Sequence, residues 1–78
     1  MTKEQLAALA QSLKDNEAFQ AALNDIRADA LEALATMSRD DELAFYTAQA
    51  TVKVVDAIRS DLEQFILKGK AKPKPGIA

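Results

Sequence analysis

A heptad repeat of apolar residues in the second half of the chain constrains its fold more than any other feature. This spacing keeps its members on one face of an α-helix. No glycine or proline interrupts the chain before Gly69, which is placed to follow the helix as its C′ residue. The pattern therefore predicts one long helix over residues 40–68. The repeat consists of Ala44, Ala48, Thr51, Val55, Ile58, Leu62 and Phe65.

Two shorter helices are predicted upstream, over residues 3–14 and 17–37. Thr2 and Gln5 have the spacing of a capping box, which indicates where the first helix begins. The motif Asp15-Asn16-Glu17 can end one helix and cap the next, although the break could also be only a kink because glycine and proline are absent. The second helix carries an inward-facing stripe formed by Phe19, Leu23, Ile26, Ala30, Leu34 and Met37.

The junction before residue 40 predicts the architecture. Ser38, with Asp41 three residues later, resembles a capping box, and the acidic residues around Asp41 favour a helix N-terminus. A short capped loop between two long helices predicts an antiparallel helical hairpin. The fold class is therefore all-α, with a short additional N-terminal helix. Residues 1–68 form a single helical domain, and residues 69–78 form an extended basic Lys/Pro tail.

The chain has more large apolar residues than a hairpin can bury. Of its 78 residues, 49% are hydrophobic, but 16 are alanine and only 22 are larger. We expect the first helix to cover part of the surplus and a partner to cover the rest, because large apolar residues off the main face of a small domain usually mark an interface. The predicted interface residues are Leu31, Phe45, Tyr46, Val52 and Val54.

The composition argues against catalysis and metal binding. The chain contains no Cys, so disulfides and thiolate metal sites are excluded, and no His, the commonest metal ligand and general base. Carboxylates gather at Asp25, Asp29 and Glu32 and again at residues 40–42, without the glycine-rich loop of a calcium site. We interpret them as a solvated helix face and a helix N-terminus. The sequence predicts no catalytic, cofactor or metal residues and no enzymatic activity.

The charge of the chain changes sign near its end. Before residue 68 it carries six basic and twelve acidic side chains, and from residue 68 onward it carries four lysines and no acid. Lys70, Lys72 and Lys74 could contact nucleic-acid phosphates, without base readout because the tail has no arginine or aromatic residue. Alternatively, the Lys-Pro repeat favours an extended arm that docks on protein, with Ile77 as an apolar anchor. We favour the protein contact.

The runs from Asn16 to Leu34 and from Gln49 to Ile66, with Asp40-Asp41 between them, carry a resemblance that covers residues 16–68. They resemble small helical proteins encoded among the head and packaging genes of tailed phages. The resemblance implies a virion or assembly component that is present in many copies, of the minor capsid, decoration or neck type. It brings no catalytic residues with it.

Three functions follow as hypotheses. The first is a non-enzymatic structural protein that docks on a larger protein assembly, or on itself, through the hairpin and the C-terminal arm. The second is a small nucleic-acid accessory or packaging factor that uses the lysine tail on phosphates. The third is a helical regulator or chaperone of one protein partner.

The expected location is the virion or the host cytoplasm. No run approaches the ~18 apolar residues of a membrane span, so we expect no membrane partner. The first residues contain an early acid and lack a continuous apolar core, so we expect no signal peptide.

Overall fold

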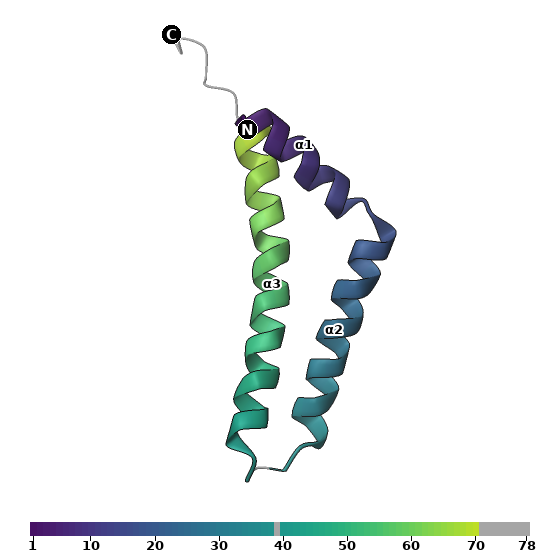
Figure 1. Ribbon diagram of the computed structural model, residues 1–78, viewed down its shortest axis with the longest axis vertical. Helices are drawn as coiled ribbons and strands as arrows, with labels where there is room; N and C mark the ends of the chain where they lie inside the picture. Colours follow the sequence, from purple (N-terminus) through teal and green to yellow (C-terminus); the bar gives the residue numbers. More distant parts are fainter. Residues whose placement is uncertain (39, 71–78) are drawn as a thin grey trace.

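The computed structural model describes residues 1–38 and 40–70, and these residues form three helices with no strand among them. The helices are α1 (Lys3–Lys14), α2 (Glu17–Thr36) and α3 (Glu42–Lys70) (Figure 1). The predicted all-α class is confirmed. The predicted tail residues Lys72, Lys74 and Ile77 lie outside the described part of the chain, whereas Lys70 is the last residue of α3 and is exposed.

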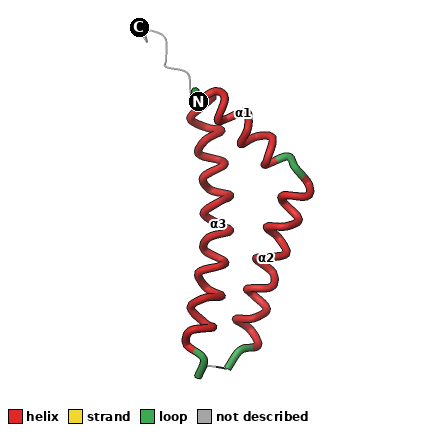
Figure 2. Tube along the Cα trace, in the orientation of Figure 1, coloured by secondary structure: helices red, strands yellow, loops and turns green. Residues whose placement is uncertain are grey.

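The long helix α3 is the element against which both other helices pack. Figure 1 shows α2 running beside the first part of α3 in the opposite direction, while α1 crosses the C-terminal end of α3. Helix α1 contacts α3 far more than it contacts α2. In Figure 2, short loops separate α1 from α2 and α2 from α3, so that α1 and α2 together form the second arm of a hairpin.

The expectation that α1 covers part of the surplus surface near Phe45 is wrong. Helix α1 buries Ala7 and Ala10, and Ala10 packs against Leu62 and Ile66 at the C-terminal end of α3. Phe45 lies near the opposite end of that helix, which begins at Glu42. Because α1 continues the direction of the α2 arm, it can reach only the end of α3 that lies beside the N-terminus.

Thr2 caps α1 and Asn16 caps α2, and the second cap shows that the two helices are separate. The predicted capping box is present, since the Gln5 amide donates to Thr2 Oγ1 at 3.0 Å and the Thr2 amide donates to Gln5 Oε1 at 2.8 Å. Asn16 is the N-cap of α2, and its Oδ1 accepts a 2.8 Å hydrogen bond from the Phe19 amide. Each cap satisfies a backbone donor that the helix itself cannot pair, so the chain breaks at Asn16 without glycine or proline.

The cap of α3 differs from the prediction. Asp41 Oδ1 accepts a 3.0 Å hydrogen bond from the Ala44 amide, so Asp41, rather than Ser38, supplies the capping oxygen. Ser38 Oγ instead accepts a 3.2 Å hydrogen bond from the Asp40 amide within the loop. The helix starts at Glu42, two residues later than predicted, because the donor that Asp41 satisfies lies three residues beyond it.

The prediction that Gly69 ends the last helix is also wrong, since α3 continues through Gly69 to Lys70. A Cβ atom at Gly69 would lie 2.2 Å from the Cβ of Ala7 and 2.8 Å from the carbonyl oxygen of Lys3. Glycine is needed here because it lets α1 approach the backbone of α3. Its role is close packing between two helices rather than a left-handed C-terminal cap.

The buried residues follow the predicted heptad stripe only in part. Val55 and Leu62 are buried, but Ile58 remains 37% exposed and Phe65 is half-buried, while Ile66 is 4% exposed. A straight α-helix has 3.6 residues per turn, so a stripe with a strict 3.5-residue repeat moves gradually around the helix. Toward the C-terminal end of α3, the face that packs against α1 therefore includes Ile66 in place of Phe65. Half of the core residues are alanine: Ala7, Ala10, Leu23, Ala30, Ala48, Val55, Leu62 and Ile66.

Candidate docking surfaces

The five predicted interface residues do not form one surface. Val54 lies on one side of the seam between α2 and α3 and Val52 lies on the other, because successive residues of a helix turn by about 100° around its axis. Tyr46 and Val54 are 62% and 56% exposed, and Val52 is half-buried. Leu31 and Phe45 are also exposed. The structure therefore divides the prediction between two surfaces.

Polar side chains join the helices along the Val52 side of the seam. Arg27 Nε on α2 donates to Asp56 Oδ1 on α3 at 2.9 Å, and Lys14 Nζ on α1 lies 2.7 Å from Glu63 Oε1. Arg59 donates to the side-chain oxygen of Asn24, one turn of α2 before Arg27. These contacts fix the antiparallel register of the two arms.

The ion pairs shift the ionisation of their members. The hydrogen bond from Arg27 lowers the pKa of Asp56 below its ordinary value, with a smaller contribution from the charges of Arg27 and Arg59. The same bond raises the pKa of Arg27. The hydrogen bond and charge of Glu63 raise the pKa of Lys14. These side chains are partly solvated, so they orient the helices more than they stabilise them.

An apolar cluster follows this polar row toward the α2–α3 loop. The Arg27–Asp56 contact sets the register of α2 against α3. Leu31 of α2 and Val52 of α3 are each one helical turn closer to the loop, so they lie level with each other. Phe45 lies two turns before Val52 on the same face of α3, and its ring packs edge-on against Tyr46 with centroids 5.6 Å apart. We call Leu31, Phe45, Tyr46 and Val52 the loop-end patch.

The other side of the seam is a shallow apolar groove between α2 and α3. Near the middle of α3, a hollow of about 420 Å³ is lined by residues that include Ile26, Val54 and Ile58. Nearer the loop, a second hollow of about 670 Å³ includes Ala33, Met37 and Thr47. Ile26, Thr47 and Thr51 line both hollows, so the two hollows adjoin. We call the surface formed by Ile26, Ala33, Met37, Thr47, Val54 and Ile58 the apolar groove.

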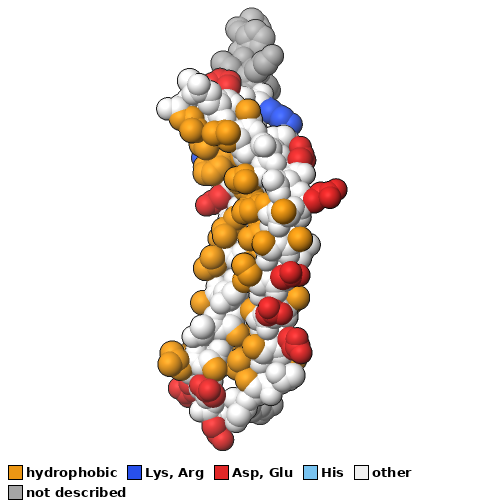
Figure 3. All heavy atoms as spheres, turned by 45° about the vertical axis from the view of Figure 1, so that its right-hand side comes forward, with side chains coloured by type: hydrophobic (Ala, Val, Ile, Leu, Met, Phe, Trp, Pro, Cys, Tyr) orange, Lys and Arg blue, Asp and Glu red, His pale blue; other side chains and the backbone are white. Residues whose placement is uncertain are grey.

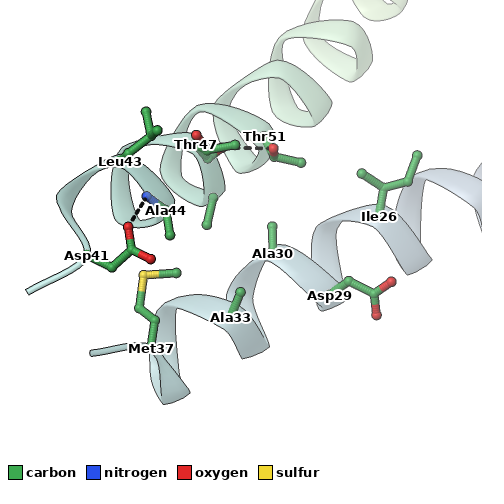
Figure 4. A pocket seen from close by; sticks show the side chains of 11 residues that line it. Ile26, Asp29, Ala30, Ala33, Met37, Asp41, Leu43, Ala44, Thr47 and Thr51 are labelled. Carbon is green, nitrogen blue, oxygen red and sulfur yellow. Dashed lines mark hydrogen bonds between the residues drawn. The ribbon is translucent and has the colours of Figure 1, made fainter. Parts of the chain in front are cut away.

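Small side chains explain why the groove is open. Figure 4 shows Ala30 and Ala33 of α2 facing α3, with Met37 close to Asp41 at the loop. Alanine lets the two backbones approach but fills little of the space beside them. Larger side chains at the edge, such as Ile26, therefore stay partly exposed.

Sequence reasoning missed the groove because its isoleucines had the spacing of core residues. Ile26 and Ile58 lie on the predicted inward stripes, yet they are 48% and 37% exposed. On its stripe Ile26 is followed by Ala30, and this small neighbour is a signal that could have indicated partial exposure of Ile26. Figure 3 shows apolar side chains along much of the length of one face of the molecule.

The described residues contain neither a metal-binding cluster nor a membrane-length helix. Within residues 1–38 and 40–70, no group of three or more His, Cys, Asp or Glu side chains is arranged to hold a metal ion. This part of the chain includes the carboxylates of Asp25, Asp29 and Glu32. None of the described helices is long and apolar enough to cross a bilayer.

Comparison with known proteins yields no relative. No protein-family model, no curated protein and no solved structure matches the chain.

Proposed function

We propose that this protein is a non-enzymatic structural or interaction protein that acts by docking on a larger protein assembly. The observation that carries this proposal is the amount of large apolar surface that the fold leaves open. In the described part of the chain, eleven large hydrophobic side chains are at least 37% exposed, and no large side chain is less than 2% exposed. Exposed apolar surface on this scale is typical of proteins that bind other proteins.

The loop-end patch is the docking surface in this proposal. Phe45 and Tyr46 are its largest members, and aromatic side chains contribute a disproportionate share of binding free energy at protein interfaces. The patch lies at the turn of the hairpin, where it can enter a hollow on another protein. The resemblance of residues 16–68 to small helical phage proteins supports a virion or assembly component that is present in many copies.

The C-terminal arm is the second element of the proposal. It includes the predicted contact residues Lys70, Lys72, Lys74 and Ile77, which follow the acidic body of the chain. An extended Lys/Pro segment can lie along a neighbouring protein at a low cost in conformational entropy. The arm would thereby strengthen a contact that the loop-end patch initiates.

Co-purification followed by a measured affinity tests this function. The protein is isolated from its native assembly, its neighbours are identified by mass spectrometry, and binding to the purified neighbour is measured by calorimetry. We expect Phe45→Asp to weaken binding at least 10-fold, because it places a charge in the docking contact. The matched control Leu67→Asp changes a similarly exposed residue near the other end of α3 and should change the affinity less than about threefold. Unchanged binding by Phe45→Asp would refute the proposal.

Nucleic-acid binding is the second candidate function, and the charge of the C-terminal end favours it. Lys68 and Lys70 lie in the last turn of α3, and the sequence beyond them adds two further lysines and no acid. If this end binds phosphates, the affinity for a DNA duplex falls steeply with salt, and each phosphate contact adds about 0.9 to the logarithmic slope. Fluorescence anisotropy of the full chain and of a chain ending at Lys70 tests this. An absence of DNA binding at low salt eliminates the candidate.

A further inference from the structure

The apolar groove exposes large side chains of the kind that normally lie in a protein core. Its central residues Ile26, Val54 and Ile58 line one hollow, and all three are more than a third exposed. The two arms of the hairpin form a single layer, so nothing among the described residues covers this side of the seam. A second helical layer placed on the groove would bury these side chains, as in a helical bundle.

The charges at the two ends of the hairpin favour one occupant in one orientation. Asp40, Asp41 and Glu42 lie at the loop end, and Asp41 also lines the groove there. Lys68 and Lys70 lie in the last turn of α3, at the other end of the molecule (Figure 1). A second copy placed antiparallel sets its basic end beside the acidic end of the first, whereas a parallel copy sets like charges side by side.

The groove also has the position that two-fold symmetry requires. Val54 and Ile58 flank the midpoint of α3, which runs from Glu42 to Lys70. A two-fold axis through this region places the centre of the groove of one copy against the centre of the groove of the second copy. The acidic end of each copy then lies beside the basic end of the other. A single surface thus supplies both halves of a closed contact.

From these observations we propose that two copies of this chain pair antiparallel, groove against groove, with Ile26, Val54 and Ile58 of each copy at the centre. The pairing rests on the proposed function in one respect, since it makes the protein an interaction protein that is present in more than one copy. It uses the groove and leaves the loop-end patch free. The two claims are therefore separable by substitution.

The mass of the purified full chain in solution tests the pairing. Sedimentation equilibrium between about 5 and 200 μM is expected to give twice the monomer mass of 8.5 kDa for the wild type. Val54→Asp is expected to raise the dissociation constant at least 100-fold and to give the monomer mass. Because Val54 is 56% exposed in the monomer, the variant should keep its helical circular dichroism. Tyr46→Asp is the matched control, since Tyr46 is 62% exposed and belongs to the loop-end patch, and it should remain dimeric.

The orientation is tested with spin labels, which the absence of native cysteine makes simple. A single label at Glu42→Cys gives one distance in each dimer by pulsed electron paramagnetic resonance. The antiparallel arrangement separates the two labels by about 40 Å, since the 29 residues of α3 rise by 1.5 Å each. A distance below about 20 Å would refute the antiparallel arrangement.

The outcomes distinguish the pairing from the docking function. A wild-type monomer at 200 μM, or a dimer of Val54→Asp with unchanged affinity, overturns the pairing. If the assembly partner still binds through Phe45 in that case, the docking function stands alone. Conversely, if Val54→Asp dissociates the dimer while Phe45→Asp binds the partner normally, the pairing stands and the docking function fails.

Discussion

Truncation of Ile66 tests whether the contact between α1 and α3 is the main core of this protein. Ile66 is 4% exposed and packs with Ala10 and Leu62, whereas its neighbour Leu67 is 58% exposed. Ile66→Ala and Leu67→Ala each remove three carbon atoms from the same turn of the same helix. The pair therefore isolates the effect of burial from those of side-chain size and position.

The expected magnitude follows from the buried carbon atoms. Three methylene equivalents at about 0.8 kcal/mol each give about 2.4 kcal/mol for Ile66→Ala. The higher helix propensity of alanine returns a few tenths of a kcal/mol, and collapse of the open core limits any cavity cost. We expect a net loss of about 2 kcal/mol. That is a large share of the roughly 4–12 kcal/mol expected for a chain of this length.

Urea unfolding, followed by circular dichroism at one fixed protein concentration, measures the loss. With a slope of about 1 kcal/mol per molar urea, Ile66→Ala should lower the midpoint by about 2 M. Leu67→Ala should change the free energy of unfolding by less than about 0.5 kcal/mol. Equal losses for the two variants, or a larger loss for Leu67→Ala, would refute the assignment of Ile66 to the core.

Two further predictions concern the helix contact at Gly69 and the ion pair of Asp56. Gly69→Ala should lower the free energy of unfolding by about 1 kcal/mol and speed hydrogen exchange in α1. The added Cβ meets Ala7 and the backbone of Lys3, and the cost of this overpacking exceeds the gain in helix propensity. A variant more stable than the wild type would contradict the contact. Asp56 has a lowered pKa in the folded state, so its pair with Arg27 stabilises the fold above the unfolded value of about 3.9, and this contribution disappears as the pH falls through the folded value. Asp56→Asn should therefore have a lower melting temperature than the wild type at pH 7 and the same melting temperature near pH 2. An equal difference in melting temperature at both pH values would show that the ion pair does not contribute to stability.

The local features of the sequence determined the helices and two of their caps. The capping box of Thr2 and Gln5 and the N-cap at Asn16 involve residues only three positions apart. Interactions at this range do not depend on where the rest of the chain lies, so they could be predicted from the residue types alone. The heptad spacing likewise identified Val55 and Leu62 as buried.

The contacts between helices depended on the tertiary structure. The sequence could not show that α1 lies on the C-terminal end of α3, so it placed Phe65 inward where Ile66 is buried and treated Gly69 as a cap. It likewise could not show that Arg59 of α3 contacts Asn24 of α2. Both outcomes depend on the rotation and register of one helix against another.

The same distinction applies to the candidate docking surfaces. The sequence indicated that Phe45 and Val54 are surplus to the core, and both are exposed in the structure. Only the packed helices separate them, with Phe45 on the loop-end patch and Val54 in the apolar groove. The physical reason is that the hydrogen bonds of a helix are made between residues three or four positions apart, whereas the faces that two helices present to each other depend on how closely they approach. In this chain, alanines and Gly69 decide that approach.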